Sequence, residues 1–525
     1  MSLSPMPLLK TCQTCFHLKI RCEKTQDSDS CDRCLRLGKT CVFNQARRRR
    51  NVNRQRTRMT PYFPFVVFPP DAPVETMNSE HPCACLAALA AASHADAATQ
   101  QALGTLFNQV VAARIADGRL KHLDLLQGLL INLAWAHYQP RPMRYTQYLH
   151  LATSIVSDLR LDRPRRPKLW SVDGGKDKNE PDWGPDEMRA LAGVYYLSSR
   201  SSCIILQKSR QVFDTSYISN CCDRLILMNQ YPTDKYLPFI MNAQTLVGKV
   251  DDVVCRTSTT NNGLQFYAEI QDITQRCTDI KSSLPFPMSE SRQYSHPDLE
   301  PWTNQFILAP LLLQIHMLEL LLSQSSPRGT SFGLDKFQDQ PQDQYSLIDW
   351  LSASMSAARS LISITLLMPQ GEEVAMSNMG WIMIHCGLNM AVRLDLIAAR
   401  GSISRSTQHL RRFLDMPHTL RQVVLRLEAT PGPEAPADHP FNDLAKRVRR
   451  LEEWYLAQAE RQSAESTRPP VCDQPTNMPV GVVMPYQESG MWPGGSEWYQ
   501  GMNLDMSTFL FADPIDYPGN LGYMN

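Results

Sequence analysis

The sequence predicts a small cysteine-rich head, a connecting segment, a mostly α-helical body and a disordered tail. Six cysteines lie between residues 12 and 41 in two matching triplets. From residue 81 onward, helix-forming residues place apolar side chains three and four positions apart. The final residues combine turn formers with acidic and aromatic side chains. We expect four parts: the head at 1–43, a basic arm and proline-rich linker at 44–80, the body at 81–465 and the tail at 466–525.

The six cysteines repeat one spacing. Each triplet reads C-x2-C-x6-C, and eight residues separate the two triplets. A C-x-x-C pair can aim both sulfurs at one ion, and zinc prefers four thiolates in a tetrahedron. Six thiolates fill two tetrahedra only if two sulfurs are shared. The head is therefore predicted to contain two Zn²⁺ ions and two short helix-loop units, with six ligands: Cys12, Cys15, Cys22, Cys31, Cys34 and Cys41.

Two other interpretations of these thiols stay open. Disulfide frameworks are typical of small secreted domains, but the start of the chain, MSLSPMPLLK, lacks the apolar core of a signal peptide. The other interpretation is two unrelated single-zinc sites. We favour the shared cluster, in which all-thiolate coordination leaves no open position for catalysis, so that the zinc is structural. A head of this length needs the metal to fold.

Charge is distributed unevenly along the chain. Residues 1–58 contain 14 Lys and Arg against 4 Asp and Glu, a net charge of +10, which leaves −9 for the remainder because the whole chain carries +1. A basic head on a mildly acidic body is typical of nucleic-acid-binding proteins. Residues 44–58 hold seven arginines, which predict a nuclear import signal or a phosphate-contacting arm rather than a merely solvated tract.

The segments TCQTCFHLKIRC (11–22) and CDRCLRLGKTC (31–41) resemble the fungal Zn2Cys6 binuclear-cluster transcription factors. The resemblance implies that Cys12 and Cys31 bridge the two ions. It also implies that a short helix begun by the first half enters the major groove of double-stranded DNA. Lys19 would then read bases in a CGG-type triplet.

Other basic residues are expected to contact DNA. Phe16 and Leu18 stand where the family usually carries Arg or Lys, which keeps a weakly DNA-binding repressor or cofactor open as an alternative. The arginine run would track phosphates, and its contacts make affinity sensitive to salt. The predicted DNA-binding residues are His17, Lys19, Arg21, Arg47, Arg48, Arg49 and Arg50.

Residues 59–80 contain five prolines, which block a continuous helix and predict a linker. Many members of the resembled family have a heptad coiled coil after such a linker, and this chain has no heptad run there. A second copy of the chain stays a candidate partner in a homodimer, but the sequence gives no support for dimerisation through a coiled coil.

The body is predicted to be helical, regulatory and non-enzymatic. It contains no nucleophile elbow, P-loop, GxGxxG turn or HExxH pair. No apolar run reaches the length of a membrane helix, and the best candidate, 308–322, is interrupted by polar residues. Residues 123–213 loosely resemble the middle homology region of the same family, which leaves a ligand-sensing body as an alternative. Helices are expected from residue 83 and at 123–139, 145–161, 185–207, 217–229, 236–256, 264–283, 303–324, 346–367, 373–399 and 441–463.

The tail has no Lys or Arg after Arg468, and its acidic residues alternate with bulky aromatic ones. This composition is typical of disordered activation segments. The stretch 504–517, LDMSTFLFADPIDY, is predicted to fold as a short amphipathic helix on a coactivator. Together the patterns predict a nuclear, sequence-specific activator of RNA polymerase II genes. The resemblance adds the expectation that it controls a metabolic or secondary-metabolite gene cluster.

Overall fold

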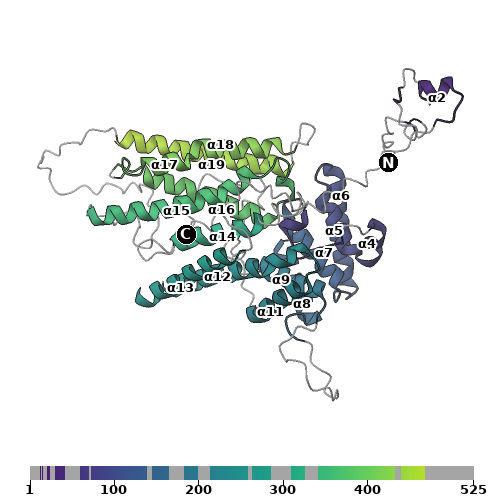
Figure 1. The fold of residues 1–525 in the computed structure, drawn as a ribbon, viewed down its shortest axis with the longest axis horizontal. Helices are drawn as coiled ribbons and strands as arrows, with labels where there is room; N and C mark the ends of the chain where they lie inside the picture. Colours follow the sequence, from purple (N-terminus) through teal and green to yellow (C-terminus); the bar gives the residue numbers. More distant parts are fainter. Residues whose placement is uncertain are drawn as a thin grey trace, which may run out of the picture. The chain divides into compact units, whose positions relative to one another are not determined.

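The computed structural model divides into two compact units, Met1–Arg56 and Thr57–Asn525 (Figure 1). All regular structure among the described residues is helical, which confirms the predicted mostly α-helical fold class. The predicted tail beyond Ser466 lies outside these residues. The described residues are 12, 15, 21–23, 30–41, 59–69, 73–138, 145–164, 183–198, 213–257, 263–284, 309–324, 341–401, 403–431 and 439–466.

The first unit contains the short helix α2, Asp32–Arg36. Cys31 precedes it in extended backbone, and its sulfur accepts a hydrogen bond from the N–H of Cys34. Gly38 follows the helix with φ of +59°, a left-handed conformation that favours glycine after a helix end. The helix expected in the first cysteine triplet falls largely on residues 16–20, which lie outside the described part of the chain.

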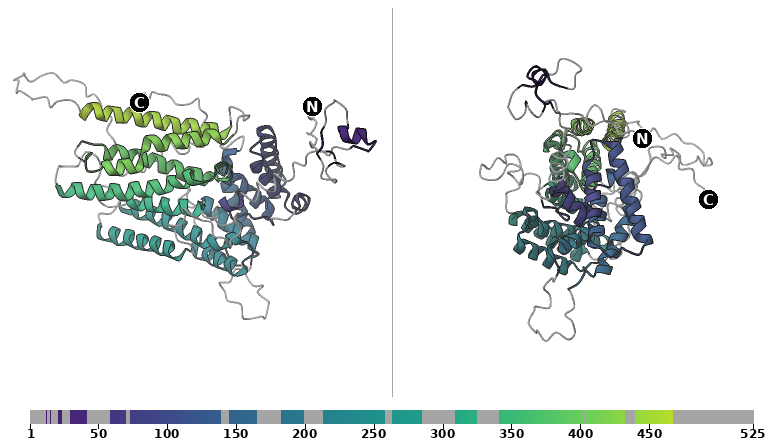
Figure 2. Two further views of the ribbon diagram at one scale, coloured as in Figure 1. Left: turned by 45° about the horizontal axis from the view of Figure 1, so that its top comes forward. Right: turned by 90° about the vertical axis from the view of Figure 1, so that its right-hand side faces the viewer.

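The second unit is a set of packed helices. In Figures 1 and 2, α12, α13 and α14 lie together, and α18 runs alongside α19. The helices are α4 (Val74–Glu80), α5 (Pro82–Ala92), α6 (Ala97–Ala116), α7 (Leu123–Ala134), α8 (Tyr145–Leu159), α9 (Pro185–Ser198), α11 (Thr215–Met228), α12 (Leu237–Thr257), α13 (Gly263–Ser283), α14 (Ala309–Gln324), α15 (Pro341–Leu367), α16 (Asn378–Ala398), α17 (Gln408–Leu414), α18 (Met416–Ala429) and α19 (Pro440–Ser466), with 3₁₀ turns η1 (Thr60–Tyr62), η2 (Ala136–Tyr138), η4 (Pro232–Tyr236) and η6 (Glu373–Ala375).

Part of the expected linker belongs to the core instead. Residues 59–69 include η1, and Phe63 and Phe65 are each only 1% exposed. The Phe63 ring meets Trp135 edge-on with ring centroids 6.0 Å apart, and Phe65 lies 5.0 Å from Tyr196. The linker prediction was therefore wrong for these residues. Their prolines prevent a long helix, but the large aromatic side chains gain more by burial than a solvated linker allows.

The motif DLLQGLL (124–130) fastens α7 to the beginning of α5. The Asp124 carboxylate accepts hydrogen bonds from the backbone N–H groups of Cys83, at 3.0 Å, and Ala84, at 2.9 Å. These are among the N–H groups that a helix leaves without an internal partner, and a carboxylate suits that end of the helix. One turn later, a Cβ on Gly128 would lie 3.0 Å from the Cys83 backbone. The motif thus combines a cap with a close approach of two helices.

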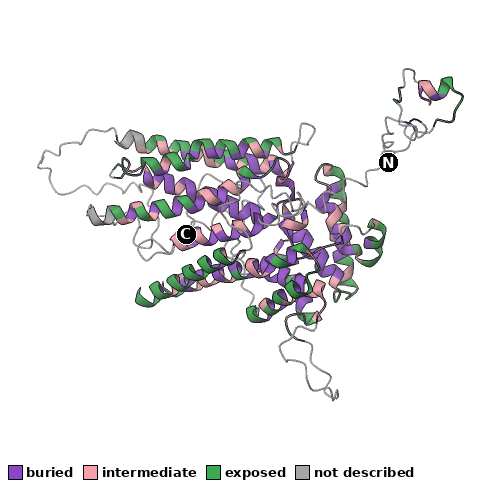
Figure 3. Cartoon of the chain, viewed as in Figure 1, coloured by how far each residue is buried: buried purple, intermediate pink, exposed green. Residues whose placement is uncertain are grey.

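Helix α16 is the central helix of the body, and Figure 3 colours nearly all of it as buried. By length and composition it is the one helix among the described residues that is apolar enough to cross a membrane, whereas the sequence analysis found no apolar run of that length and named 308–322 as the best candidate. However, 83% of its most apolar 18-residue window is buried inside the protein. Burial of this kind is what a helix at the centre of a folded domain shows.

Two further helices, α17 and α18, were not expected from the sequence. Helix α18 begins with Pro417 in its first turn, a position that tolerates proline. Its buried residues Leu420, Val423, Val424 and Leu427 lie three and four positions apart and pack against α19. The predicted helix at 441–463 is confirmed as α19, and its stripe of apolar residues faces the body.

Candidate metal centre

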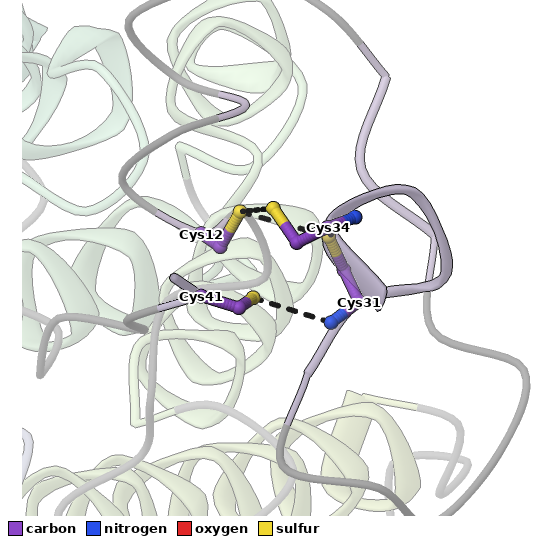
Figure 4. A group of neighbouring side chains, drawn as sticks. All are labelled: Cys12, Cys31, Cys34 and Cys41. Atoms are coloured by element: carbon purple, nitrogen blue, oxygen red, sulfur yellow. Dashed lines mark hydrogen bonds between the residues drawn. The ribbon is translucent and has the colours of Figure 1, made fainter. Parts of the chain in front are cut away.

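Six cysteines converge in the first unit. Their sulfurs form two groups of four, in each of which all Sγ atoms lie within 4.8 Å of one another. One group is Cys12, Cys15, Cys22 and Cys31, and the other is Cys12, Cys31, Cys34 and Cys41. Figure 4 shows the second group, with its sulfurs turned towards one another. Cys12 and Cys31 belong to both groups, and these are the two residues that the family resemblance implies as bridging ligands.

The sulfur separations suit zinc. The Sγ of Cys12 lies 3.7 Å from the Sγ atoms of Cys31 and Cys34, and the Sγ of Cys15 lies 3.8 Å from that of Cys31. A Zn–S bond of about 2.3 Å places the sulfurs of a regular tetrahedron about 3.8 Å apart. A disulfide would need sulfurs about 2.05 Å apart, and all six cysteines are free. The geometry therefore fits metal thiolates and excludes a disulfide framework for these residues.

Backbone N–H groups point at the sulfurs in the same way in both halves. The N–H of Cys15 donates to the sulfur of Cys12 at 3.4 Å, and the N–H of Cys34 donates to the sulfur of Cys31 at 3.5 Å. The third cysteine of each triplet is held similarly. The N–H of Cys12 donates to the sulfur of Cys22 at 3.4 Å, and that of Cys31 donates to Cys41 at 3.2 Å. The repeated sequence spacing thus produces a repeated hydrogen-bond pattern.

The pKa values of the cysteine thiols shift in different directions. The N–H donated by Cys34 lowers the pKa of the Cys31 thiol to about 6, against the opposing effect of burial. Burial also opposes ionisation of Cys12, but hydrogen bonds from Cys15 and Cys34 outweigh it and lower the pKa of that thiol. In contrast, burial raises the pKa of Cys15, and that of Cys34 to about 12. The pKa values of Cys12 and Cys31 thus shift in the opposite direction from those of Cys15 and Cys34.

The cysteines are also the core of the head. Among its described residues, the buried cluster consists of Cys12, Cys15, Cys31 and Cys34, with Cys22 and Cys41 packed against it. Leu35 and Leu37, which a conventional core would enclose, are 59% and 49% exposed. Without an ion, four buried thiols offer little apolar area to hold the fold together. The residues present thus fit a structural metal centre.

Arg21 is the one predicted DNA-contacting residue that the structure describes. Its side chain is 88% exposed, and its Nε lies 2.8 Å from a carboxylate oxygen of Glu23. The sequence had not singled out Glu23. The signal available was an acidic residue two positions after Arg21, in an otherwise basic segment. His17, Lys19 and Arg47–Arg50 lie outside the described residues.

The comparison with known proteins gives two fungal relatives. The chain is 28% identical to Transcription factor himD of Aspergillus japonicus, in an alignment of 543 positions that covers 88% of this chain and 86% of that protein. It is 23% identical to Transcription factor opdL of Penicillium oxalicum, over 47% of this chain and 57% of that protein. No protein-family model matches the chain, and no solved structure matches it. Both relatives are transcription factors and not enzymes.

Proposed function

We propose that this chain, a homologue of fungal transcription factors with a six-cysteine group consistent with a Zn2Cys6 cluster, is a zinc-dependent, sequence-specific DNA-binding regulator. The observation that supports the proposal most strongly is the pair of four-thiol groups sharing Cys12 and Cys31. A cluster of this kind leaves no coordination position for a substrate, and zinc that is fully coordinated by thiolates is structural. Its use is to hold a recognition surface rigid.

Two zinc ions would be held by two sets of four cysteines, and the two sets would share two residues. Cys15 and Cys22 would belong to the first ion, Cys34 and Cys41 to the second, and Cys12 and Cys31 to both. When bound, the ions would supply the cross-links that replace a hydrophobic core in this short unit. The backbone N–H groups that point at the sulfurs would offset part of the negative charge of six thiolates.

The basic residues around the cluster would then meet duplex DNA. Lys19 is proposed to read bases in a CGG-type triplet, Arg21 and His17 to contact the same groove, and Arg47–Arg50 to track phosphates. Selection of bound duplexes from a random pool, with the full chain and zinc, tests this proposal. Recovery of a CGG-type half-site is expected, and recovery of no enriched sequence would contradict sequence-specific binding. The symmetry of the recovered site also reports whether one chain or a homodimer binds.

Homology to transcription factors implies action in the nucleus. We further propose that the acidic and aromatic tail recruits coactivators, so that the chain is an activator, and that its targets belong to a metabolic or secondary-metabolite gene cluster. Residues 469–525 fused to a heterologous DNA-binding domain test the first point. A silent reporter would favour the repressor or cofactor alternative, which the apolar Phe16 and Leu18 near the DNA-facing residues still support.

Ligand sensing by the body is a second candidate function, and one cluster favours it. The rings of His137 and Trp381 both meet Phe441 edge-on, with ring centroids 6.5 and 5.6 Å away. Within the described residues, both His137 nitrogens, the Trp381 Nε1 and both amide atoms of Asn378 are buried without a hydrogen-bond partner. Buried polar groups are normally paired, so the unpartnered His137 and Trp381 nitrogens around Phe441 are where a small polar molecule would gain hydrogen bonds. Thermal-shift screening of small neutral metabolites, with wild type and Trp381→Phe compared, tests it.

A further inference from the structure

We infer that Glu23 is a built-in competitor for DNA, which holds the guanidinium of Arg21 in the free protein and must release it when a duplex binds. The inference rests on the proposed DNA-binding function. It adds an acidic residue that weakens DNA binding and thereby adjusts the affinity, whereas the basic residues of this region strengthen binding. The observation behind it is the Arg21–Glu23 ion pair, with Nε and Oε1 2.8 Å apart.

The backbone keeps the two side chains next to each other. The carbonyl oxygen of Glu23 accepts a hydrogen bond from the N–H of Asp32 at 3.0 Å, which ties the residue to the first turn of α2. Between the pair, the sulfur of Cys22 accepts from the N–H of Cys12 at 3.4 Å. Residues 22 and 23 are therefore held by hydrogen bonds to both cysteine triplets, through Cys12 of the first and Asp32 of the second. Release of Arg21 needs rotation of side chains only, because the backbone of Glu23 is already fixed.

Both side chains are exposed to solvent and therefore accessible to a duplex. The side chain of Arg21 is 88% exposed and that of Glu23 is 59% exposed. An incoming phosphate is an anion that competes directly with the Glu23 carboxylate for the same guanidinium. Once displaced, that carboxylate lies close to the negatively charged DNA backbone and repels it. Glu23 therefore opposes binding twice, first through the pair that must be broken and then through its own charge.

The size of the effect follows from the exposure of the pair. An exposed ion pair contributes little free energy to the state that contains it. Loss of such a pair therefore changes an equilibrium constant about two- to fivefold. Glu23→Gln is therefore expected to tighten DNA binding about two- to fivefold at low salt. Because salt screens both the exposed ion pair and the repulsion between Glu23 and DNA, this gain in affinity should shrink as the salt concentration rises. A residue with a merely structural role would give no salt-dependent gain in affinity.

A double-mutant cycle tests the inference with full-length protein and zinc. Fluorescence anisotropy measures the affinity for one labelled duplex containing a CGG triplet, at several salt concentrations, with wild type, Glu23→Gln, Arg21→Ala and the double variant. Equal zinc content in the four proteins verifies that the cluster is intact. Glu23→Gln should tighten binding in the presence of Arg21 and have a smaller effect in the Arg21→Ala background.

Two results would overturn the inference and leave the proposed function standing. One is that wild type binds the duplex and Glu23→Gln binds it with the same affinity. The other is an equal gain from Glu23→Gln with and without Arg21, because a general charge effect would then explain it. If zinc-loaded wild type failed to bind any duplex, including those of the random pool, the proposed DNA-binding function and this inference would both fall.

Discussion

The buried ion pair between Arg189 and Asp234 offers a quantitative test of how the body is held together. The two residues come from α9 and η4, and their side chains are 1% and 0% exposed. The guanidinium of Arg189 donates to both carboxylate oxygens of Asp234 at 2.8 Å, and to Asp186 and Gln230 at 2.9 Å. Arg189→Met would remove all four hydrogen bonds and leave the Asp234 carboxylate buried, with a hydrogen bond from the backbone N–H of Tyr231.

Breaking a buried pair by removing one partner costs roughly 3–5 kcal/mol, because the other charge stays in a low-dielectric environment. We therefore expect Arg189→Met to lower the urea midpoint of the helical circular-dichroism signal strongly. Arg189→Met/Asp234→Leu should recover part of the loss, because the uncompensated charge is then gone.

Arg163→Met is the matched control for this measurement. Arg163 also makes two hydrogen bonds to one carboxylate, that of Asp162, at 3.0 and 2.9 Å, but its side chain is 54% exposed. Water screens an exposed pair, so its removal should leave the midpoint nearly unchanged. Similar losses from Arg163→Met and Arg189→Met would refute the argument that burial sets the cost. An unchanged midpoint for Arg189→Met would refute it as well.

Three further predictions concern different parts of the chain. Gly193→Ala should destabilise the body by roughly 1–3 kcal/mol, since its Cβ would lie 2.7 Å from a buried phenylalanine, whereas Gly401→Ala has open space and should be neutral in the same urea assay. Lys19→Ala should abolish sequence preference in DNA binding, whereas Arg48→Ala should weaken all sequences alike; equal losses would contradict the assigned roles. Burial lowers the pKa of His137 to about 3, so the unfolded chain binds a proton that the folded chain does not between about pH 6.5 and 3. Stability should therefore fall as pH drops through that window, and His137→Phe should weaken the dependence in pH-resolved unfolding; an unchanged pH profile would contradict it.

The grouping of the six cysteines was the most predictable part of the molecule. Ligand spacing is a local property, so the two triplets identify the six thiols without knowledge of the fold. The sharing of Cys12 and Cys31 came from the family resemblance, and the sulfur geometry agrees with it. Glu23 was missed because its importance depends on which side chain its carboxylate meets, and its position two residues after Arg21 in a basic segment was a weak signal.

The body was predictable as helical but not in its packing. Strong apolar periodicity located α7, α8 and α16, since helix type follows from spacing within a segment. The assignment of 59–69 to a linker failed because proline content describes the backbone, whereas burial of Phe63 and Phe65 depends on Trp135 and Tyr196, distant in sequence. Helix α18 was missed because the segment is short and its exposed face is polar, so that the helical spacing of its few apolar residues is a weak signal.

The zinc content of the purified full-length chain tests the central claim most directly. Elemental analysis should find two zinc ions per chain. Cys31→Ser should disturb both ions because this sulfur belongs to both four-thiol groups, whereas Cys41→Ser should cost no more than one. If the wild-type chain contained one zinc ion or none, a shared two-zinc cluster would be contradicted. The same holds if Cys31→Ser lost one zinc ion and kept the other undisturbed.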